Sequence, residues 1–278
     1  MDLSAKIELV SVSDTGRKRP HNEDSAITHP KIGLALVADG MGGYRAGEVA
    51  SAIAAKAILD VIGSNLHVAQ DQRSEHSGCA LSKQAVLVRD SILGANRQIL
   101  KTATAVPECL GMGTTIVTTL FYNNRVIIAH VGDSRVYRYR DDHLAQVTND
   151  HSLVQELIDR GFGTAEDAEA NMPRNIVTRA LGIGENVEVD VKEEAALPGD
   201  IYLLCSDGLN DMVDDKEIRL TLSKYSGNLV GTAHELVGLA NESGGQDNIS
   251  VVLARPQAPF PAESRILANL MGLLTRGR

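Results

Sequence analysis

Four acidic residues occupy the same kind of position in this 278-residue chain, at or beside the end of an apolar run. They are Asp39 after residues 34–38, Asp133 after 127–131, Asp207 after 201–205, and Asp247 before 249–253. Unbroken apolar runs of this length are typical of buried strands. Carboxylates gathered at strand ends without a matching basic cluster repel one another unless hard divalent cations lie between them. The four acids together therefore predict a divalent metal site.

Taken singly, each acid has a simpler explanation. An Asp-Gly pair after an apolar run, as at Asp39 and Asp207, is more often a hairpin turn than a ligand, and Asp247 fits a turn residue equally well. Only the set of four favours a metal. Asp39 could then bridge two cations about 3.5–4 Å apart, and the Gly40 carbonyl could supply another oxygen ligand; such a pair activates a bridging water and binds a phosphoryl oxygen.

A basic turn at residues 16–24 (GRKRPHNED) adds a second chemical element. It places Arg17, Lys18 and Arg19 a few residues before Glu23 and Asp24. Arginine binds a phosphate through paired N–H donors in a geometry that lysine cannot reproduce. From spacing alone, a phosphate-binding turn and a solvated basic turn are equally favoured.

Composition and charge exclude several function classes. Apolar residues make up 43% of the chain and charged residues 23%, as in ordinary soluble proteins. The net charge of -9 argues against a nucleic-acid partner, since phosphate backbones attract basic surfaces. Three widely spaced cysteines indicate no disulfide framework and fit a reducing cytosol. No apolar signal segment and no apolar run near the ~20 residues of a membrane span are found, so a cytoplasmic protein without a transmembrane segment is expected.

The hydrophobic pattern predicts blocks of strands separated by pairs of helices, which is typical of an α+β fold with antiparallel sheets. The region from 114 to 147 predicts an antiparallel meander, and a further strand pair is expected at 187–191 and 201–205. A polar stretch at 63–78 is expected to separate the first two helices. The other expected strands are 7–13, 25–28, 32–38 and 249–253, and the expected helices are 46–61, 81–99, 152–158, 215–222 and 229–241.

We expect one main domain at residues 1–255 and a C-terminal tail at 256–278. The tail opens with prolines and ends in an amphipathic segment, which favours a helix docked on its own domain over a partner-docking or membrane-surface helix. Residues 161–173 are acidic and rich in Ala and Gly at their start, and they predict a surface loop or flap.

Eight motifs, in this order along residues 11–254, resemble the metal-dependent protein phosphatases (the PPM, or type 2C, family) in their bacterial form. They are SDTGRKRPHNEDS at 13–25, LVADGMGG at 36–43, GMGTT at 111–115, HVGDSRVY at 130–137, DHSLVQELIDRG at 150–161, NIVTRALG at 175–182, CSDGLNDMV at 205–213 and GGQDNISVVLA at 244–254. The resemblance implies an α-β-β-α sandwich of two antiparallel sheets flanked by helix pairs. It also implies Mn²⁺- or Mg²⁺-dependent hydrolysis of phosphoserine and phosphothreonine in proteins.

The resemblance also implies site roles by matching positions. Asp39 would bridge two core ions, and the Gly40 carbonyl would bind one of them. Asp207 and Asp247 would complete the shell of the second ion. Arg19 would bind the phosphate, while Arg17 and Lys18 would be ordinary turn residues. The remaining implied ligands are Glu23 and Asp24 through bound waters, and Asp133 for a weaker third ion.

The implied mechanism is direct attack of a metal-bridging hydroxide on phosphorus, without a phosphoenzyme, while Arg19 and the ions neutralise developing charge. The chain departs from relatives at the positions of their candidate general acids. Met41 and Tyr44 stand where relatives carry a histidine, and Met172-Pro173 stands where many carry His-Pro. A metal-bound water is therefore the first choice for the general acid. His151 is the protein candidate, with a structural role favoured.

Two alternatives stay open: a pseudophosphatase that binds phosphoproteins, and a phosphohydrolase of small phosphate esters. The complete acidic ligand set favours an enzyme over a pseudophosphatase. The expected partners are phosphorylated proteins and, by analogy, an opposing bacterial Ser/Thr kinase, and the protein is expected to be a monomer. The acidic flap predicts a preference for basic or neutral sequence around the phosphorylated residue.

Overall fold

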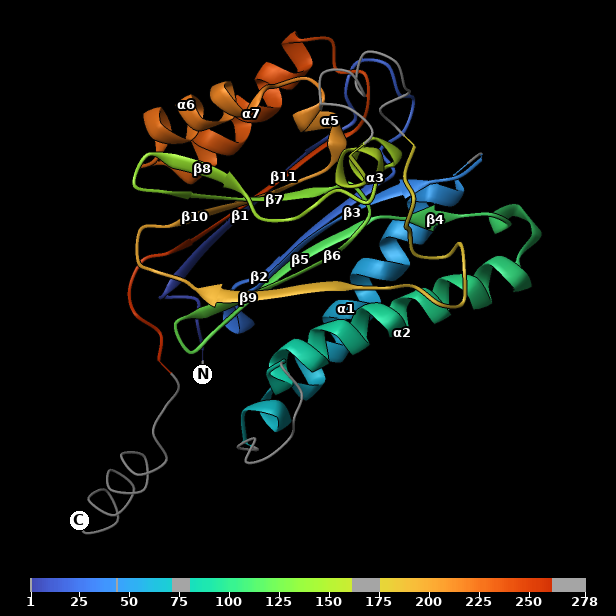
Figure 1. Cartoon of the computed structure of the whole chain (residues 1–278), viewed down its shortest axis with the longest axis horizontal. Helices are drawn as coiled ribbons and strands as arrows, with labels where there is room; N and C mark the ends of the chain where they lie inside the picture. Colours follow the sequence, from blue (N-terminus) through green and yellow to red (C-terminus); the bar gives the residue numbers. More distant parts are fainter. Residues whose placement is uncertain (1, 44, 72–80, 162–175, 262–278) are drawn as a thin grey trace.

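The computed structural model describes residues 2–43, 45–71, 81–161 and 176–261, which form two antiparallel sheets packed face to face with helices outside (Figure 1). One sheet has the order β2(Asp24–His29)-β3(Leu34–Met41)-β5(Ile116–Tyr122)-β6(Arg125–Val131)-β9(Asp190–Ala195), with β4(Gly113–Thr114) on β3. The other has the order β1(Ile7–Asp14)-β11(Ile249–Pro256)-β10(Ile201–Cys205)-β7(Arg135–Arg140)-β8(His143–Gln146). This architecture confirms the expected α-β-β-α sandwich.

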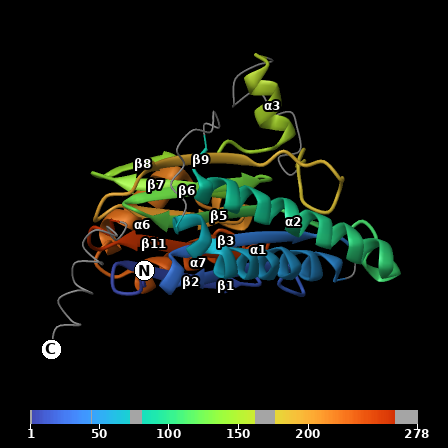
Figure 2. The same ribbon diagram turned by 90° about the horizontal axis from the view of Figure 1, so that it is seen from below.

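Helices cover the outer face of each sheet. The pair α1(Ala46–Asp71) and α2(Lys83–Ala105) packs on the sheet that contains β3, and Figure 2 shows the two helices side by side. The pair α6(Asp215–Tyr225) and α7(Leu229–Glu242) packs on the other sheet. Short helices α3(Leu153–Asp159) and α5(Asp207–Asn210) follow strand ends, and 3-10 turns occur at Pro30–Ile32 and Pro107–Cys109.

The unbroken apolar run on β3 is explained by burial on both faces. Leu34, Leu36 and Ala38 lie in the core shared with α1 and α2, whereas Ala35 and Val37 lie in the core between the two sheets. Successive strand residues point to opposite faces, so a strand between two apolar layers must be apolar at every position. The residue that follows, Asp39, is thereby carried to the edge of both cores.

The first helix is longer than expected. Residues 63–71, which the sequence analysis places in a polar connection, continue α1, and Ile62 and Leu66 extend its buried stripe by i+4 steps from Ile58. By length and composition, Ala46–Leu66 is the one helix among the described residues long and apolar enough to cross a membrane, with 44% of its most apolar window buried. A core helix packed on a sheet meets the same two criteria.

The predicted meander is wrong, because its four strands divide between the two sheets. β5 and β6 pair in one sheet, and β7 pairs with β8 and β10 in the other. The chain crosses between them at Gly132, whose φ of +110° and closeness to Thr115, 2.7 Å from a Cβ at this position, exclude a side chain. The expected pair at 187–191 and 201–205 is wrong for the same reason, since β9 pairs with β6 and β10 with β11 and β7.

The chain beyond β11 begins by docking on the sandwich. Phe260 is buried, its ring centroid lies 6.2 Å from that of Phe121, and its N–H donates to Asn124 Oδ1 at 2.6 Å. The expected amphipathic tail segment and residues 162–173 of the expected flap lie outside the described residues, as does Tyr44. The domain limits therefore stay a prediction.

Candidate metal centre

The backbone around Asp39 is fixed by the neighbouring strands. Its N–H donates to Thr115 Oγ1 at 3.0 Å, and its carbonyl accepts from the Thr115 N–H at 2.9 Å. Asp24 lies directly opposite Asp39 in the β2–β3 ladder, so both side chains project from the same face. Gly40 follows, and a Cβ there would lie 2.2 Å from the Gly47 carbonyl oxygen, so only glycine lets α1 begin this close to β3.

The second sheet brings two more acids to the same place. β10 ends at Cys205, and Asp207 begins α5 immediately afterwards. Ser206, between them, donates its hydroxyl to Asp24 Oδ2 at 2.9 Å and so connects the two sheets. Asp133, 7% exposed, lies at the crossing from β6 to β7. Segments that are far apart in the sequence thus present their carboxylates between the ends of the two sheets.

Asn248 fixes the turn that carries Glu23, and sequence reasoning missed this role. Its Nδ2 donates to the carbonyls of Thr15 and His21, both at 2.9 Å, and its Oδ1 accepts from the Glu23 N–H at 2.8 Å. One buried amide therefore holds the turn at both ends. The available signal was its place directly after Asp247 in the sequence QDN, next to a residue already singled out.

Arg19 leaves this turn and reaches the acids. Its Nη2 lies 2.6 Å from Asp247 Oδ2, and 55% of its side chain is exposed. The hydrogen bond to Asp247 raises the pKa of Arg19. Arg17 and Lys18 are exposed, and their N–H groups donate to the Gly245 carbonyl at 2.7 and 3.2 Å. Within the basic turn, Arg19 is thus the cation placed at the acids.

One cleft of about 390 Å³ collects most of the residues that the sequence analysis selected. Asp24, opposite Asp39 in the β2–β3 ladder, does not line it, and His151 is also not among its lining residues. Met41 and His21 line it as well, and the sequence analysis had not considered His21. The selected residues along the cleft are Arg19, Glu23, Asp39, Gly40, Asp133, Asp207 and Asp247.

The carboxylates of the cleft resist ionisation in the protein alone. Burial raises the pKa of Asp39 well above its ordinary value, and repulsion from Asp24 and Asp207 adds to the shift. Burial, then repulsion from Asp133, raises the pKa of Asp207 to about 8. Burial likewise raises the pKa of Asp24 and of Asp133 to about 6 each, and it raises that of Glu23. The positive charge needed to hold these groups ionised exceeds what Arg19 supplies.

The donor set fits hard divalent cations. Asp24 Oδ1 and Asp207 Oδ1 are buried without a hydrogen-bond partner, although buried polar atoms are almost always satisfied. Carboxylate oxygens with a nearby backbone carbonyl, such as that of Gly40, are the ligands that Mg²⁺ and Mn²⁺ prefer. A cation would both satisfy these oxygens and relieve the repulsion among the acids.

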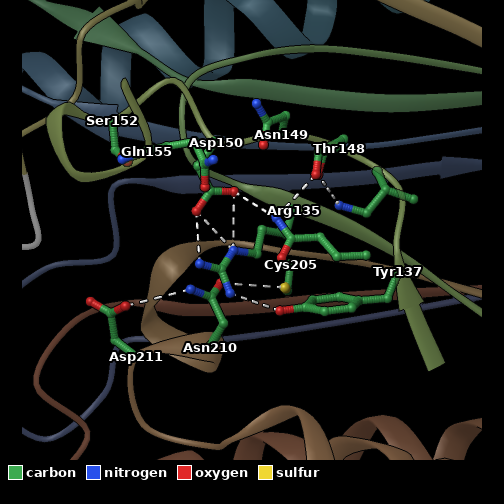
Figure 3. Close-up of polar contacts among 12 residues, drawn as sticks. Arg135, Tyr137, Thr148, Asn149, Asp150, Ser152, Gln155, Cys205, Asn210 and Asp211 are labelled. Atoms are coloured by element: carbon green, nitrogen blue, oxygen red, sulfur yellow. Dashed lines mark hydrogen bonds and ion pairs between the residues drawn. The ribbon is translucent and has the colours of Figure 1, made fainter. Parts of the chain in front are cut away.

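A half-buried ion pair supports the start of β7 next to Asp133. Arg135 donates through Nε and Nη2 to Asp150 Oδ2 at 2.9 and 2.7 Å, and through Nη1 to the Tyr137 hydroxyl at 2.9 Å (Figure 3). The nearby guanidinium opposes the rise in the pKa of Asp133 that burial causes. The pair fixes the crossing on one side and the segment before His151 on the other.

His151 holds the crossing rather than facing the cleft. The ring Nδ1 of His151 accepts a hydrogen bond from the Gly132 N–H at 3.1 Å, and the backbone N–H of His151 donates to the Gly132 carbonyl at 3.0 Å. The ring also stacks on that of His130, with the ring centroids 4.5 Å apart. His130, His151 and Asp190 offer ligand atoms within 4.8 Å of one another. However, Arg179 Nη1 lies 3.3 Å from both His151 and Asp190 and places a positive charge there, which disfavours a cation.

The raised pKa of Asp207 predicts a pH-dependent effect on stability. The pKa of Asp207 in the folded state, about 8, exceeds the ordinary value for an aspartate. The folded state therefore retains a proton that the unfolded state releases, and the contribution of this group to stability falls as pH rises between the two values. In chelator, the free energy of unfolding of Asp207→Asn relative to the original protein should therefore increase from pH 5.5 to 8.5, by urea titration. A difference in unfolding free energy that stays constant with pH would contradict the raised pKa of Asp207.

Mn²⁺ should increase the unfolding free energy of the original protein and should increase that of Asp207→Asn much less.

A histidine series tests the role of His151. His151→Ala leaves the buried Gly132 N–H unpaired, at a cost of about 1–3 kcal/mol, and should weaken Mn²⁺ binding measured by calorimetry. His151→Asn can replace Nδ1 with its Oδ1 acceptor and should recover part of both losses. His143→Ala, on exposed β8, is the matched control. Equal losses of stability and of Mn²⁺ affinity in His151→Ala and His151→Asn would instead show that His151 acts through its packing on His130.

Comparison with known proteins gives the family. Residues 17–242 match the family model described as protein phosphatase 2C. The chain is 41% identical over 242 residues to the serine/threonine protein phosphatase PstP of Mycobacterium tuberculosis, covering 87% of this chain but only 43% of that protein. It is 38% identical over 244 residues to the serine/threonine phosphatase stp of Listeria innocua, covering 87% of this chain and 92% of that protein. A crystal structure of the PstP catalytic domain in complex with two manganese ions superposes with a TM-score of 0.75 at 37% identity, covering 90% of this chain and 98% of that one. The chain belongs to the protein phosphatase 2C family.

Proposed function

We propose that this protein is a divalent-cation-dependent phosphatase that hydrolyses phosphoserine and phosphothreonine in proteins. The observation that carries the proposal is the convergence of five buried or half-buried acids with Arg19 along one cleft. Buried carboxylates that repel one another are costly to stability, so this arrangement is expected where cations bind. The names of the relatives, including a PstP domain crystallised with two manganese ions, support the same reaction.

The proposed ligands follow from the geometry of the cleft. Asp39, at the end of β3 near the second sheet, would hold both cations, and the adjacent Gly40 carbonyl would bind one of them. Asp207 and Asp247 would bind from the second sheet, and Asp133, which lines the cleft at the crossing, would bind a weaker third ion. Glu23 lines the cleft and Asp24 lies opposite Asp39 on β2, and both would contact the ions through water. We propose Mn²⁺ or Mg²⁺ as the ions, since both accept these oxygens.

The chain's own residues bind and orient the phosphoryl group. When bound, the cations supply Lewis acidity and a nucleophilic water. Arg19 is half-exposed above the acids and can exchange its contact with Asp247 for two parallel hydrogen bonds to phosphate oxygens. There it would stabilise the charge that develops on these oxygens during transfer. Asn248 keeps the Arg19 turn at a fixed distance from Asp39, so the guanidinium and the cations act on the same phosphoryl group.

The remaining assignments are proposals of the same kind. The substrates are phosphorylated proteins, and a Ser/Thr kinase is the opposing enzyme. The protein acts as a cytoplasmic monomer. The complete acid set disfavours a pseudophosphatase, because a binding module would not need to retain every carboxylate.

Phosphate release from a phosphothreonine peptide, with and without Mn²⁺, tests the proposed function. Turnover of small phosphate esters alone would instead assign the protein to the small-ester phosphohydrolases.

Replacing the bridging acid should separate catalysis from folding. Asp39→Asn removes one buried charge from a repelling group, so its free energy of unfolding in chelator should equal or exceed that of the original protein at pH 8. Its Mn²⁺-dependent phosphate release should fall by about three orders of magnitude, a loss of the size seen when electrostatic groups at reaction centres are removed. Asp90→Asn, an exposed acid on α2 paired with Arg89, is the control. Full activity of Asp39→Asn would refute the assignment.

Arg19 should be replaceable only in part. Arg19→Ala should lower kcat/KM for a phosphothreonine peptide by about 10- to 100-fold, as expected for hydrogen bonds to a charged group. Arg19→Lys should recover less than half of this loss in free energy, because an ammonium cannot form the paired contact. Arg17→Ala, in the same exposed turn, should have no comparable effect. Equal losses for Arg17→Ala and Arg19→Ala would assign the effect to turn structure.

A further inference from the structure

The cleft continues as a path onto the outer face of α1. A hollow of about 430 Å³ shares His21 with the cleft, and a groove of about 690 Å³ shares Arg45 and Val49 with that hollow. These shared residues connect the phosphate-binding end of the protein to the surface of α1 beside α2, two helices that lie side by side in Figure 2.

The groove has an apolar floor between charged ends. Its floor follows one face of α1 at the spacing of successive helical turns. Two ion pairs flank it, Arg45 with Glu48 at 2.9 Å and Lys56 with Asp60 at 2.8 Å. The apolar floor consists of Val49, Ala52, Ile53, Ala57 and Val61.

This surface leaves part of the apolar side of α1 uncovered. Ala57 belongs to the core shared with α2, and Val49 and Ile53 pack against that core. Ala52 is exposed, and Val49, Ile53 and Val61 are half-buried. The floor therefore offers apolar surface, beside the exposed Lys56 and Asp60, that another chain could contact.

Resting on the proposed function, we propose that this α1 groove binds the substrate polypeptide on one side of its phosphorylated residue, and that good substrates carry apolar side chains there. The phosphate fixes the substrate in the cleft, and its chain must leave along a surface continuous with the cleft. Arg45 and Lys56 lie about 16 Å apart along the helix axis, the length of about five extended residues. Apolar side chains some three to eight positions from the phosphorylated residue would reach the floor.

The opposite side of the cleft differs in character. A smaller hollow of about 260 Å³ shares Arg19, Asp207 and Asp247 with the cleft and adds Asp211 and Met212. Its acidic side chains offer little contact to apolar residues. The preference for apolar side chains should therefore be directional, present on one side of the phosphorylated residue and absent on the other.

Peptide kinetics test this proposal. Phosphothreonine peptides of about 17 residues carry either Leu or Ser at positions three to eight, on the N-terminal or the C-terminal side. For the original protein, Leu on one side should raise kcat/KM about tenfold over Ser, mainly through KM. Ala52→Glu places a charge on the groove floor and should reduce this Leu-to-Ser ratio to near one. Ser64→Glu, exposed on the same helix but outside the groove, should leave the ratio at about ten.

Binding measured without turnover separates this proposal from the proposed function. In chelator, fluorescence anisotropy of the labelled Leu peptide should show about tenfold weaker binding to Ala52→Glu than to Ser64→Glu. A Leu-to-Ser ratio of one in the original protein, or equal ratios in the two variants, would overturn the groove. A dimer in sedimentation velocity that Ala52→Glu abolishes would also overturn it, because a second copy would then be the occupant. Absence of Mn²⁺-dependent phosphate release from every peptide would refute only the proposed function, while the anisotropy result would still decide the groove.

Discussion

The mutual repulsion of buried carboxylates is the constraint on which the rest of this structure depends. Asp39 and Asp207 are half-buried beside other acids, and their pKa values are raised because ionisation there is costly. A chain tolerates such a group only where the surrounding structure holds it in place and where function repays the cost. Here a ladder partner, the Ser206 hydroxyl and the Thr115 hydroxyl hold the segments that carry the acids. The result is a set of acids held in fixed positions along one cleft.

The two-sheet architecture explains how distant segments supply one centre. Each sheet presents strand ends at the same edge of the sandwich, and the chain crosses between sheets at Gly132, directly before Asp133. His151 and Arg135 fix this crossing by hydrogen bonds on either side. Asn248 plays the corresponding role for the basic turn. The polar residues that do not reach the cleft thus determine where the reactive ones lie.

The proposed catalysis and the proposed recognition would use different parts of the surface. The cleft holds several acids and one guanidinium, that of Arg19, and would suit a phosphoryl group on any polypeptide. A cleft of this kind distinguishes substrates weakly, because every phosphorylated residue presents the same oxygens. The apolar outer face of α1 offers the additional contacts that selectivity requires.

The sequence by itself determined the fold class and the set of acids worth considering, because these depend on local runs and ordered motifs. Only the tertiary structure decided which sheet each hairpin joins, since strand pairing between segments such as β1 and β11 joins residues more than 200 positions apart. It also assigned Asn248 and the Arg135–Asp150 pair their positioning roles, because a hydrogen bond across the fold leaves no periodic signal in the chain. The length of α1 was likewise decided by packing, since its polar last turns become helical through the burial of Ile62 and Leu66.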